Sequence, residues 1–286
     1  MALGIGDDGA LINPSADTQL VMASDTLVES VHFPADASGE QIASRALCVN
    51  LSDMAAMGAT PKWFTLALTM PKHLANNQWL KSFSAGLADV AKEFDIALVG
   101  GDTTLGPLAV SITMLGEVPV GQALQRNGAL VGDAIYVTGT LADGAAALNM
   151  LKANANKVTE DSERLLARFY RPQPQIEAGI ALRNIASACI DISDGLVADL
   201  GHICLASGVK ANLVAQWLPI HRQLREMSEA DYLNWALTGG DEYQLCFTLS
   251  ANNKIIVDQW IAEGKLMATM IGQITQSCDS GELVTV

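Results

Sequence analysis

The sequence predicts a mixed protein of the α/β (α+β) class that folds as two consecutive domains. Strand-like and helix-like patterns alternate along the whole chain, which is typical of mixed folds. The chain has 286 residues, half of them apolar, and this is enough for two domains of ordinary size. A glycine-containing segment at 126–133 interrupts the pattern. We therefore expect a first domain at 1–126 and a second domain at 127–286.

The best-defined element of the first domain is a helix at 38–57. Ser38 followed by Gln41 is a capping box, which marks a helix start, and Gly58 is a typical helix stop. The helix is apolar almost all round, so we expect most of its surface to be covered. Asp53 has no basic side chain three or four residues away on either side. A distant basic residue, a capped turn or a metal ion could each accommodate this carboxylate.

The remaining segments are expected to alternate between strands and helices. Strands are predicted at 20–23, 64–69, 96–99, 108–118, 134–137, 188–190, 243–249 and 267–274. Helices are predicted at 74–94, 142–151, 160–169, 175–187, 196–206 and 253–263. In both domains several strands run directly into acidic turns, so we expect the chemistry of the protein at those turns.

The charge balance excludes several classes of partner. The chain carries 31 acidic and 17 basic residues, a formal net charge of −14, which argues against nucleic acid and anionic membranes. We find no apolar run of membrane-spanning length and no signal peptide pattern. The five cysteines are scattered, without a CxxC pair, and are expected to be buried thiols of a cytoplasmic protein.

Carboxylates next to glycine or serine recur along the chain. Such residues stand at Asp7, Asp8, Asp25, Asp102, Asp191, Asp194, Asp241 and Glu242. Each alone is an ordinary turn former or helix cap. Together they favour Mg²⁺ or Ca²⁺, because both ions prefer oxygen ligands. No P-loop, EF-hand or protein-kinase motif is present, so an acidic protein that binds phosphates would need cations to do so.

Six motifs occur in an order that resembles the thiamine-monophosphate kinase family, of the superfamily that includes aminoimidazole ribonucleotide synthetase. The motifs are GIGDDGA at 4–10, SDTLVESVHF at 24–33, NLSDMAAMGA at 50–59, GGDTT at 100–104, DISDGL at 191–196 and GGDEYQL at 239–245. They span nearly the whole chain. The resemblance implies transfer of the γ-phosphoryl group of ATP to the phosphate of thiamine monophosphate, giving thiamine diphosphate.

The resemblance also implies which residues bind the ligands. It assigns several Mg²⁺ ions to Asp8, Ser24, Asp25, Asp53, Asp102, Asp191 and Asp194. It assigns ATP to Gly101, Asp102, Arg126 and Ser193, and the acceptor to His32 with Asp241 or Glu242. It further implies a homodimer whose N-terminal domains share a β-barrel, with a C-terminal α/β domain of mixed sheet and helices behind each. No general base is expected, because a phosphate acceptor is already largely deprotonated at neutral pH.

The sequence departs from the family pattern in several places. The usual Gly-Gly-Glu-Asp-Tyr is Gly-Gly-Asp-Glu-Tyr here, and Ala23-Ser24 replaces two hydroxyl residues before Asp25. The family's helical segment before the first glycine turn and its aromatic-containing tail lie outside this sequence. The alternatives are another ATP-using enzyme of the superfamily and a non-catalytic nucleotide- or cation-binding protein. The former would need a reactive cysteine, which the first glycine turn does not offer.

Overall fold

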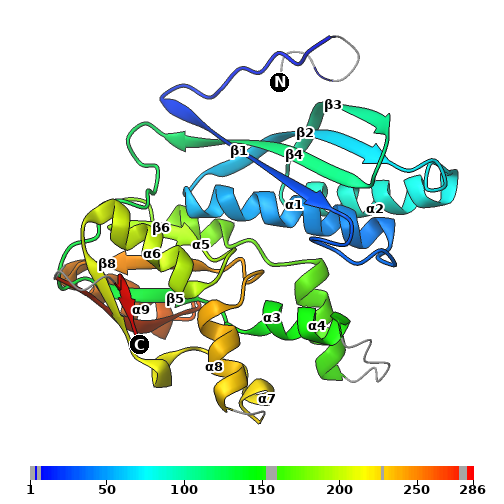
Figure 1. The fold of residues 1–286 in the computed structure, drawn as a ribbon. Helices are drawn as coiled ribbons and strands as arrows, with labels where there is room; N and C mark the ends of the chain where they lie inside the picture. The colour runs from blue at the N-terminus through cyan, green and yellow to red at the C-terminus, as the bar shows by residue number, and fades with distance from the viewer. Residues whose placement is uncertain (1–3, 5–7, 153–159, 227–228, 277–281) are drawn as a thin grey trace. The chain divides into compact units, whose positions relative to one another are not determined.

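The computed structural model describes residues 4, 8–152, 160–226, 229–276 and 282–286, so Asp7 lies outside the described residues. The chain forms two compact units (Figure 1). The first unit comprises Met1–Met54 with Ala59–Gly121, and the second comprises Ala55–Gly58 with Gln122–Val286. A domain boundary after residue 126 stays a prediction.

The first unit is a four-stranded sheet with two helices on one face (Figure 1). The strands, in their order across the sheet, are β1 (Thr18–Val28), β4 (Ala109–Pro119), β2 (Thr60–Met70) and β3 (Ala97–Leu105). The pairs β1–β4 and β2–β4 are antiparallel, and β2–β3 is parallel. The helices α1 (Gly39–Ala56) and α2 (Asn77–Glu93) cover the face on which Val110, Ile112 and Met114 are buried.

Helix α1 confirms the prediction made from its capping signals. The Ser38 hydroxyl accepts a hydrogen bond from the Gln41 N–H (3.2 Å), and the Gln41 side-chain oxygen accepts one from the Ser38 N–H (2.9 Å). Gly58 follows the helix with φ of +60°, a left-handed conformation that favours glycine. Leu47 and Leu51 are completely buried, as expected for a helix that is apolar almost all round.

Strands β1 and β3 extend further than the sequence pattern predicts. Asp25 lies inside β1 and not in a turn, because β1 pairs with β4 along its whole length. Likewise Gly101 and Asp102 lie within β3, which pairs with β2 past a register shift after Phe64. Gly101 has φ of +148°, and a Cβ there would lie 1.9 Å from the Leu66 carbonyl oxygen. Only glycine fits that close approach.

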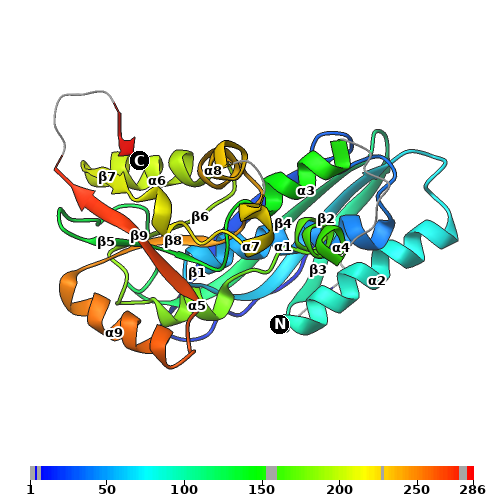
Figure 2. The ribbon, with the colours of Figure 1, turned by 90° about the horizontal axis from the view of Figure 1, so that it is seen from below.

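The second unit has a six-stranded sheet with helices on both faces (Figure 2). Its strands, in order across the sheet, are β10 (Val284–Thr285), β7 (Lys210–Leu213), β9 (Ala268–Thr275), β5 (Ala134–Thr138), β8 (Leu245–Leu249) and β6 (Ala188–Asp191). All pairs are antiparallel except β10–β7. Helix α6 (Leu196–Ser207) covers one face, and α9 (Ala251–Ala262) covers the other.

Each face of this sheet has its own packing. Ile203 and Cys204 of α6 belong to one buried cluster with Val137 and Cys246 of the sheet. On the face towards α9 the rings of Tyr136 and Phe247 stack with centroids 5.6 Å apart. The central strands β5 and β8 are buried at every residue, which explains why their sequences do not alternate between apolar and polar residues.

The helices that flank this sheet agree only in part with the sequence pattern. The others in this unit are α3 (Asp143–Lys152), α4 (Glu160–Tyr170), α5 (Ile176–Ala181), α7 (Arg222–Arg225) and α8 (Glu229–Thr238). Helix α5 is shorter than the predicted 175–187 because Asn184 adopts a left-handed conformation (φ +59°). The prediction missed β7, α7, α8 and β10. Among the described helices none is long and apolar enough to cross a membrane.

Candidate functional site

The first unit contains a cavity of about 550 Å³, hereafter the first-unit cavity. It is lined by the acidic turn at 8–10, by two residues of β2 and by residues 98–103 of β3. Asp8, Gly101 and Asp102 are therefore brought together, although some ninety residues separate the two segments. The pairing of β2 with β3 places Gly100 and Gly101 in the lining of this cavity.

A second group of predicted residues gathers where β1 runs over α1. The Asp25 N–H donates to the Asn50 side-chain oxygen (3.1 Å), and Asp53 follows Asn50 by one helical turn. Burial raises the pKa of the Asp25 carboxyl above its ordinary value, while the nearby His32 acts in the opposite direction. His32 Nδ1 accepts a hydrogen bond from the Val28 N–H (3.0 Å). Asp25, His32 and Asp53 thus share one region of the first unit.

A buried arginine anchors the loop that carries His32. Arg45 of α1 is 1% exposed, and its Nε donates to the His32 carbonyl oxygen (2.9 Å). Because Nδ1 of the ring accepts from Val28, the neutral imidazole carries its hydrogen on Nε2. His32 therefore offers an N–H donor at an exposed position.

The structure does not bring the Ser24 side chain to Asp25. Neighbouring residues of a strand point to opposite faces of the sheet. The Ser24 hydroxyl donates to the Ile112 carbonyl oxygen (3.1 Å) and lies 3.0 Å from the Thr113 hydroxyl. Ser24 belongs to the exposed face of β1, together with Met22.

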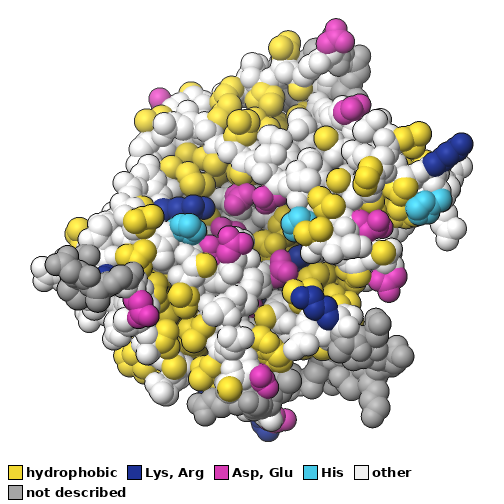
Figure 3. Space-filling view, in the orientation of Figure 1, with side chains coloured by type: hydrophobic (Ala, Val, Ile, Leu, Met, Phe, Trp, Pro, Cys, Tyr) yellow, Lys and Arg dark blue, Asp and Glu magenta, His cyan; other side chains and the backbone are white. Residues whose placement is uncertain are grey.

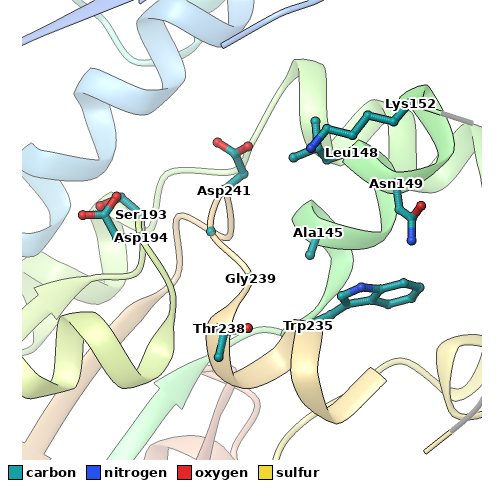
Figure 4. A pocket seen from close by; sticks show the side chains of 11 residues that line it. Ala145, Leu148, Asn149, Lys152, Ser193, Asp194, Trp235, Thr238, Gly239 and Asp241 are labelled. Carbon is teal, nitrogen blue, oxygen red and sulfur yellow. The ribbon is translucent and has the colours of Figure 1, made fainter. Parts of the chain in front are cut away.

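The second unit contains a cavity of about 510 Å³, hereafter the second-unit cavity (Figure 4). Figure 4 shows Ser193 and Asp194 on one side of it and the residues of α3, including Lys152, on the other. Asp241 lies between them, and Trp235 of α8 lies below. Three of the predicted ligand-binding residues therefore line one cavity.

Two turns that line this cavity, at 193–195 and 239–243, are joined by backbone hydrogen bonds. These bonds continue the pairing of β6 and β8. The Asp241 N–H donates to the Ser193 carbonyl oxygen (2.9 Å), and the Tyr243 N–H donates to the Ile192 carbonyl oxygen (2.8 Å). Asp191 ends β6 opposite Leu245 and is 6% exposed. The motifs DISDGL and GGDEYQL are thus neighbours in space.

Asp241 and Glu242 occupy different environments although they are adjacent in sequence. Asp241 lines the second-unit cavity, and the Tyr243 hydroxyl donates to its Oδ1 (3.0 Å). Glu242 is 3% exposed and accepts a hydrogen bond from the Gly144 N–H (3.3 Å) at the start of α3. Burial raises the pKa of Glu242 well above its ordinary value; Asp143 adds to the shift, and Arg168 opposes it.

Comparisons with known proteins agree with this geometry. Residues 6–118 match the family model of the N-terminal domain of AIR synthase related proteins, and residues 131–284 match the model of the C-terminal domain. The chain is 46% identical to the thiamine-monophosphate kinase of Salmonella typhimurium over 95% of this chain and 84% of the relative. The chain belongs to the thiamine-monophosphate kinase family. The resemblance deduced from the six motifs is confirmed.

Solved structures of the family share the fold. Thiamine-monophosphate kinase from Stenotrophomonas maltophilia K279a superimposes with a TM-score of 0.91 at 46% identity, covering 99% of this chain and 90% of that one. AaThiL complexed with AMPPCP and TMP gives a TM-score of 0.85 at 31% identity, covering 99% of this chain and 87% of that one. The mixed α/β class predicted from the sequence is confirmed.

The predicted ligand residues of the family are divided between the two units. Asp8, Asp25, Asp53 and Asp102 belong to the first unit, and Asp191 and Asp194 to the second. Within the described ranges no three His, Cys, Asp or Glu side chains form a cluster that could hold a metal ion. Arg126 is exposed and lines neither of the two cavities.

Sequence reasoning missed several residues at these sites. Lys152 and Trp235 line the second-unit cavity, and Tyr243 contacts Asp241. Asp199 accepts hydrogen bonds from the turn at 193–195. The one available signal was the aspartate four residues after Gly195, which is a spacing that permits contact across one helical turn.

Proposed function

We propose that this chain transfers the γ-phosphoryl group of ATP directly to the phosphate of thiamine monophosphate, with Mg²⁺ ions between the two anions. ATP as donor and thiamine monophosphate as acceptor follow from membership of the family, one of whose structures was solved with AMPPCP and TMP. The observation that carries the proposal is that four of the six family motifs, at 4–10, 100–104, 191–196 and 239–245, contribute residues to the lining of two cavities of this chain. The product is thiamine diphosphate.

The donor atoms available suit Mg²⁺. The candidate ligands are the carboxylates of Asp8, Asp25, Asp53, Asp102, Asp191 and Asp194. Mg²⁺ prefers oxygen, and it is commonly held by one or two carboxylates together with substrate phosphates and water. This preference explains how single carboxylates can serve without a preformed cluster. When bound, the metal ions neutralise charge and align the phosphate oxygens. Ser24 belongs to the candidate set through the family resemblance alone, because its hydroxyl donates to the Ile112 carbonyl oxygen.

We assign the ligands to the cavities as follows. Among the residues that we assign to ATP, Gly101 and Asp102 line the first-unit cavity and Ser193 lines the second-unit cavity. Arg126, exposed in the second unit, would pair with the nucleotide. The acceptor would meet Asp241, because Glu242 is buried beneath the turn.

The reaction is proposed to proceed without a general base. The acceptor phosphate has a second pKa near 6, so its attacking oxygen is already mostly deprotonated at neutral pH. Holding two anions in line is then the main barrier, and positioning together with electrostatic stabilisation lowers it. His32, the only histidine assigned to the site, offers an Nε2–H donor and would hold the acceptor phosphate by a hydrogen bond.

The buried thiols disfavour the rival chemistry of the superfamily. Burial raises the pKa of Cys189, Cys204 and Cys246, and it suppresses the thiolate that a nucleophilic cysteine requires. Cys48 is also buried, and Cys278 lies outside the described residues. The reduced, buried state of the four described cysteines supports our proposal of a cytoplasmic location.

We also propose a homodimer in which the first units of two copies form a shared β-barrel. Strand β1 is an edge of its sheet, and its outer face exposes Leu20 (46%) and Met22 (70%). An exposed edge strand with large apolar side chains favours pairing with another chain. The face opposite α1 is the one that a partner would cover.

The test is an ADP-release assay with and without thiamine monophosphate, at several Mg²⁺ concentrations. We expect release that depends on both, with thiamine diphosphate formed in equal amount. ADP release independent of thiamine monophosphate would point to another ATP-using activity of the superfamily. Binding of ATP without any ADP release would favour a non-catalytic nucleotide-binding protein and overturn the proposal.

A further inference from the structure

The backbone N–H groups of the acidic turn at 193–195 donate hydrogen bonds to a buried carboxylate. Asp199 of α6 is 3% exposed, and its Oδ2 accepts hydrogen bonds from three consecutive N–H groups. The distances are 3.0 Å from Ser193, 3.0 Å from Asp194 and 3.1 Å from Gly195. A single carboxylate oxygen thus accepts hydrogen bonds from all three residues of the turn.

Successive N–H groups that point to one spot normally form an anion-binding site for a ligand phosphate. In this chain the protein fills that site with its own carboxylate. A phosphate therefore cannot use these three amides, and the turn can offer a ligand only its outward side. That side carries Ser193, which is half-buried, and Asp194, which is exposed.

The same turn also positions Asp241, which lines another part of the second-unit cavity. The Ser193 carbonyl oxygen accepts the Asp241 N–H, so a displacement of the turn moves Asp241 as well. Gly195 has φ of +123°, a conformation that glycine alone adopts easily. The hydrogen bond from its N–H to the Asp199 carboxylate stabilises this conformation.

We infer that Asp199 is the positioning residue of the second-unit cavity, converting an amide turn that would bind phosphate into one that presents Ser193 and Asp194 to a metal-bound nucleotide. This inference rests on the proposed function for its ligand. Asp199 itself touches neither nucleotide nor metal; it acts through the backbone of the turn.

A purely structural reading makes a different prediction. A carboxylate in the first turn of a helix often reaches back to N–H groups ahead of the helix and stabilises it. Asp199 as a cap alone would change the melting temperature without changing metal affinity or substrate KM. Ser250, whose hydroxyl accepts the Asn253 N–H at the start of α9, supplies a matched cap in the same unit.

The experiment compares Asp199→Ala and Asp199→Asn with the parent and with Ser250→Ala. Amide hydrogen exchange is followed at 193–195, Mn²⁺ binding is titrated by electron paramagnetic resonance, and kcat and KM are measured with Mg²⁺. In Asp199→Ala we expect exchange at these three amides to accelerate by about tenfold or more, because their acceptor is gone. The Mn²⁺ dissociation constant and the KM for ATP should rise by about fivefold or more.

Asp199→Asn keeps an acceptor oxygen at the same place, so it should retain protection of the amides and most of the affinity. Ser250→Ala should lower the melting temperature without altering either constant. Unchanged Mn²⁺ affinity and KM in a folded Asp199→Ala protein would overturn the inference. If that variant does not fold, an Asn variant with protected amides but fully lost Mn²⁺ binding would overturn it too. Exchange and Mn²⁺ binding need no turnover, so an inactive parent would remove the proposed function alone.

Discussion

The turn at 241–243 combines two unusual backbone conformations with one side-chain hydrogen bond. Asp241 (φ +65°) and Tyr243 (φ +52°) are both left-handed although neither is glycine. Such residues cost on the order of 1–3 kcal/mol each and are typical of ligand-binding positions. The Tyr243 hydroxyl donates to Asp241 Oδ1 at 3.0 Å and so holds the carboxylate in one rotamer.

We predict that Tyr243→Phe raises the KM for thiamine monophosphate about three- to tenfold, since one hydrogen bond is worth about 1 kcal/mol. The value of kcat should stay near that of the parent. Tyr136→Phe is the matched control, because it removes a hydroxyl that donates to Asp258 on the α9 face (2.6 Å). Steady-state kinetics of both variants decide the matter, and an equal KM in the two would refute the positioning role of Tyr243.

The buried Glu242 predicts a pH dependence of stability. Its folded pKa is raised well above the ordinary value, mainly by burial, so folding favours the neutral carboxyl. Its contribution to the free energy of unfolding is complete below the ordinary glutamate pKa and is lost as pH rises towards the raised one. Glu242→Gln keeps an acceptor for the Gly144 N–H and removes this loss.

We expect Glu242→Gln to melt at a higher temperature than the parent at pH 8 and to lose that advantage near pH 4. Thermal melts across this range without metal ions test it. A variant that melts below the parent at pH 8 would show that ionised Glu242 is stabilised in the fold, with Arg168 the candidate partner.

At the scale of the element, α1 links packing with chemistry. Its capping box fixes the start of the helix, and Leu47, Leu51 and Met54 are fully buried. Asn50 accepts the Asp25 N–H, which ties β1 to the helix one turn before Asp53. The helix and the strand thereby each contribute one proposed metal ligand, Asp53 from α1 and Asp25 from β1.

We predict that Asp53→Asn lowers kcat/KM by about 100-fold or more, because a lost metal ligand removes several kcal/mol of transition-state stabilisation. Without metal the variant should be at least as stable as the parent, since the substitution replaces a half-buried negative charge by a neutral amide. Melting curves with and without Mg²⁺ check both statements. A metal-free variant that melts well below the parent would identify Asp53 as a structural ion-pair member.

At the scale of the whole molecule, charge and exposed apolar surface set the interactions. On the face drawn in Figure 3, Lys and Arg side chains are few and isolated while acidic groups recur, in line with the net charge of −14. Such a surface repels anionic partners and leaves divalent cations as the natural bridge to nucleotides. Large apolar side chains of β1 remain exposed.

We predict a dimer that Met22→Lys converts to monomer, because a charge would enter the proposed interface. Leu205→Lys is the matched control, since Leu205 is equally exposed (70%) but lies on α6 of the second unit. Light scattering at micromolar concentration measures both. A parent protein that is monomeric under these conditions would remove the shared-barrel proposal.

Local signals determined much of this protein from its sequence alone. The capping box of Ser38 and Gln41 predicted helix α1, and the six ordered motifs predicted the family. The alternation of strand-like and helix-like patterns predicted the mixed fold. These features depend on residues close in sequence or on composition. The assignment of the metal, ATP and acceptor residues stays a prediction.

Tertiary structure decided what depends on partners distant in the chain. The acidic segment around Asp25 is a strand because it pairs with β4, and the segment around Asp102 is a strand because it pairs with β2. Hydrogen bonds to residues far along the chain override the local preference for a turn. The turn at 239–243 put Asp241 at a cavity and buried its neighbour Glu242 against α3, which lies about a hundred residues earlier. Asp199 could be assigned to the turn at 193–195 only when three N–H groups were seen to converge on its carboxylate, because their direction is set by the fold and not by their spacing in the sequence.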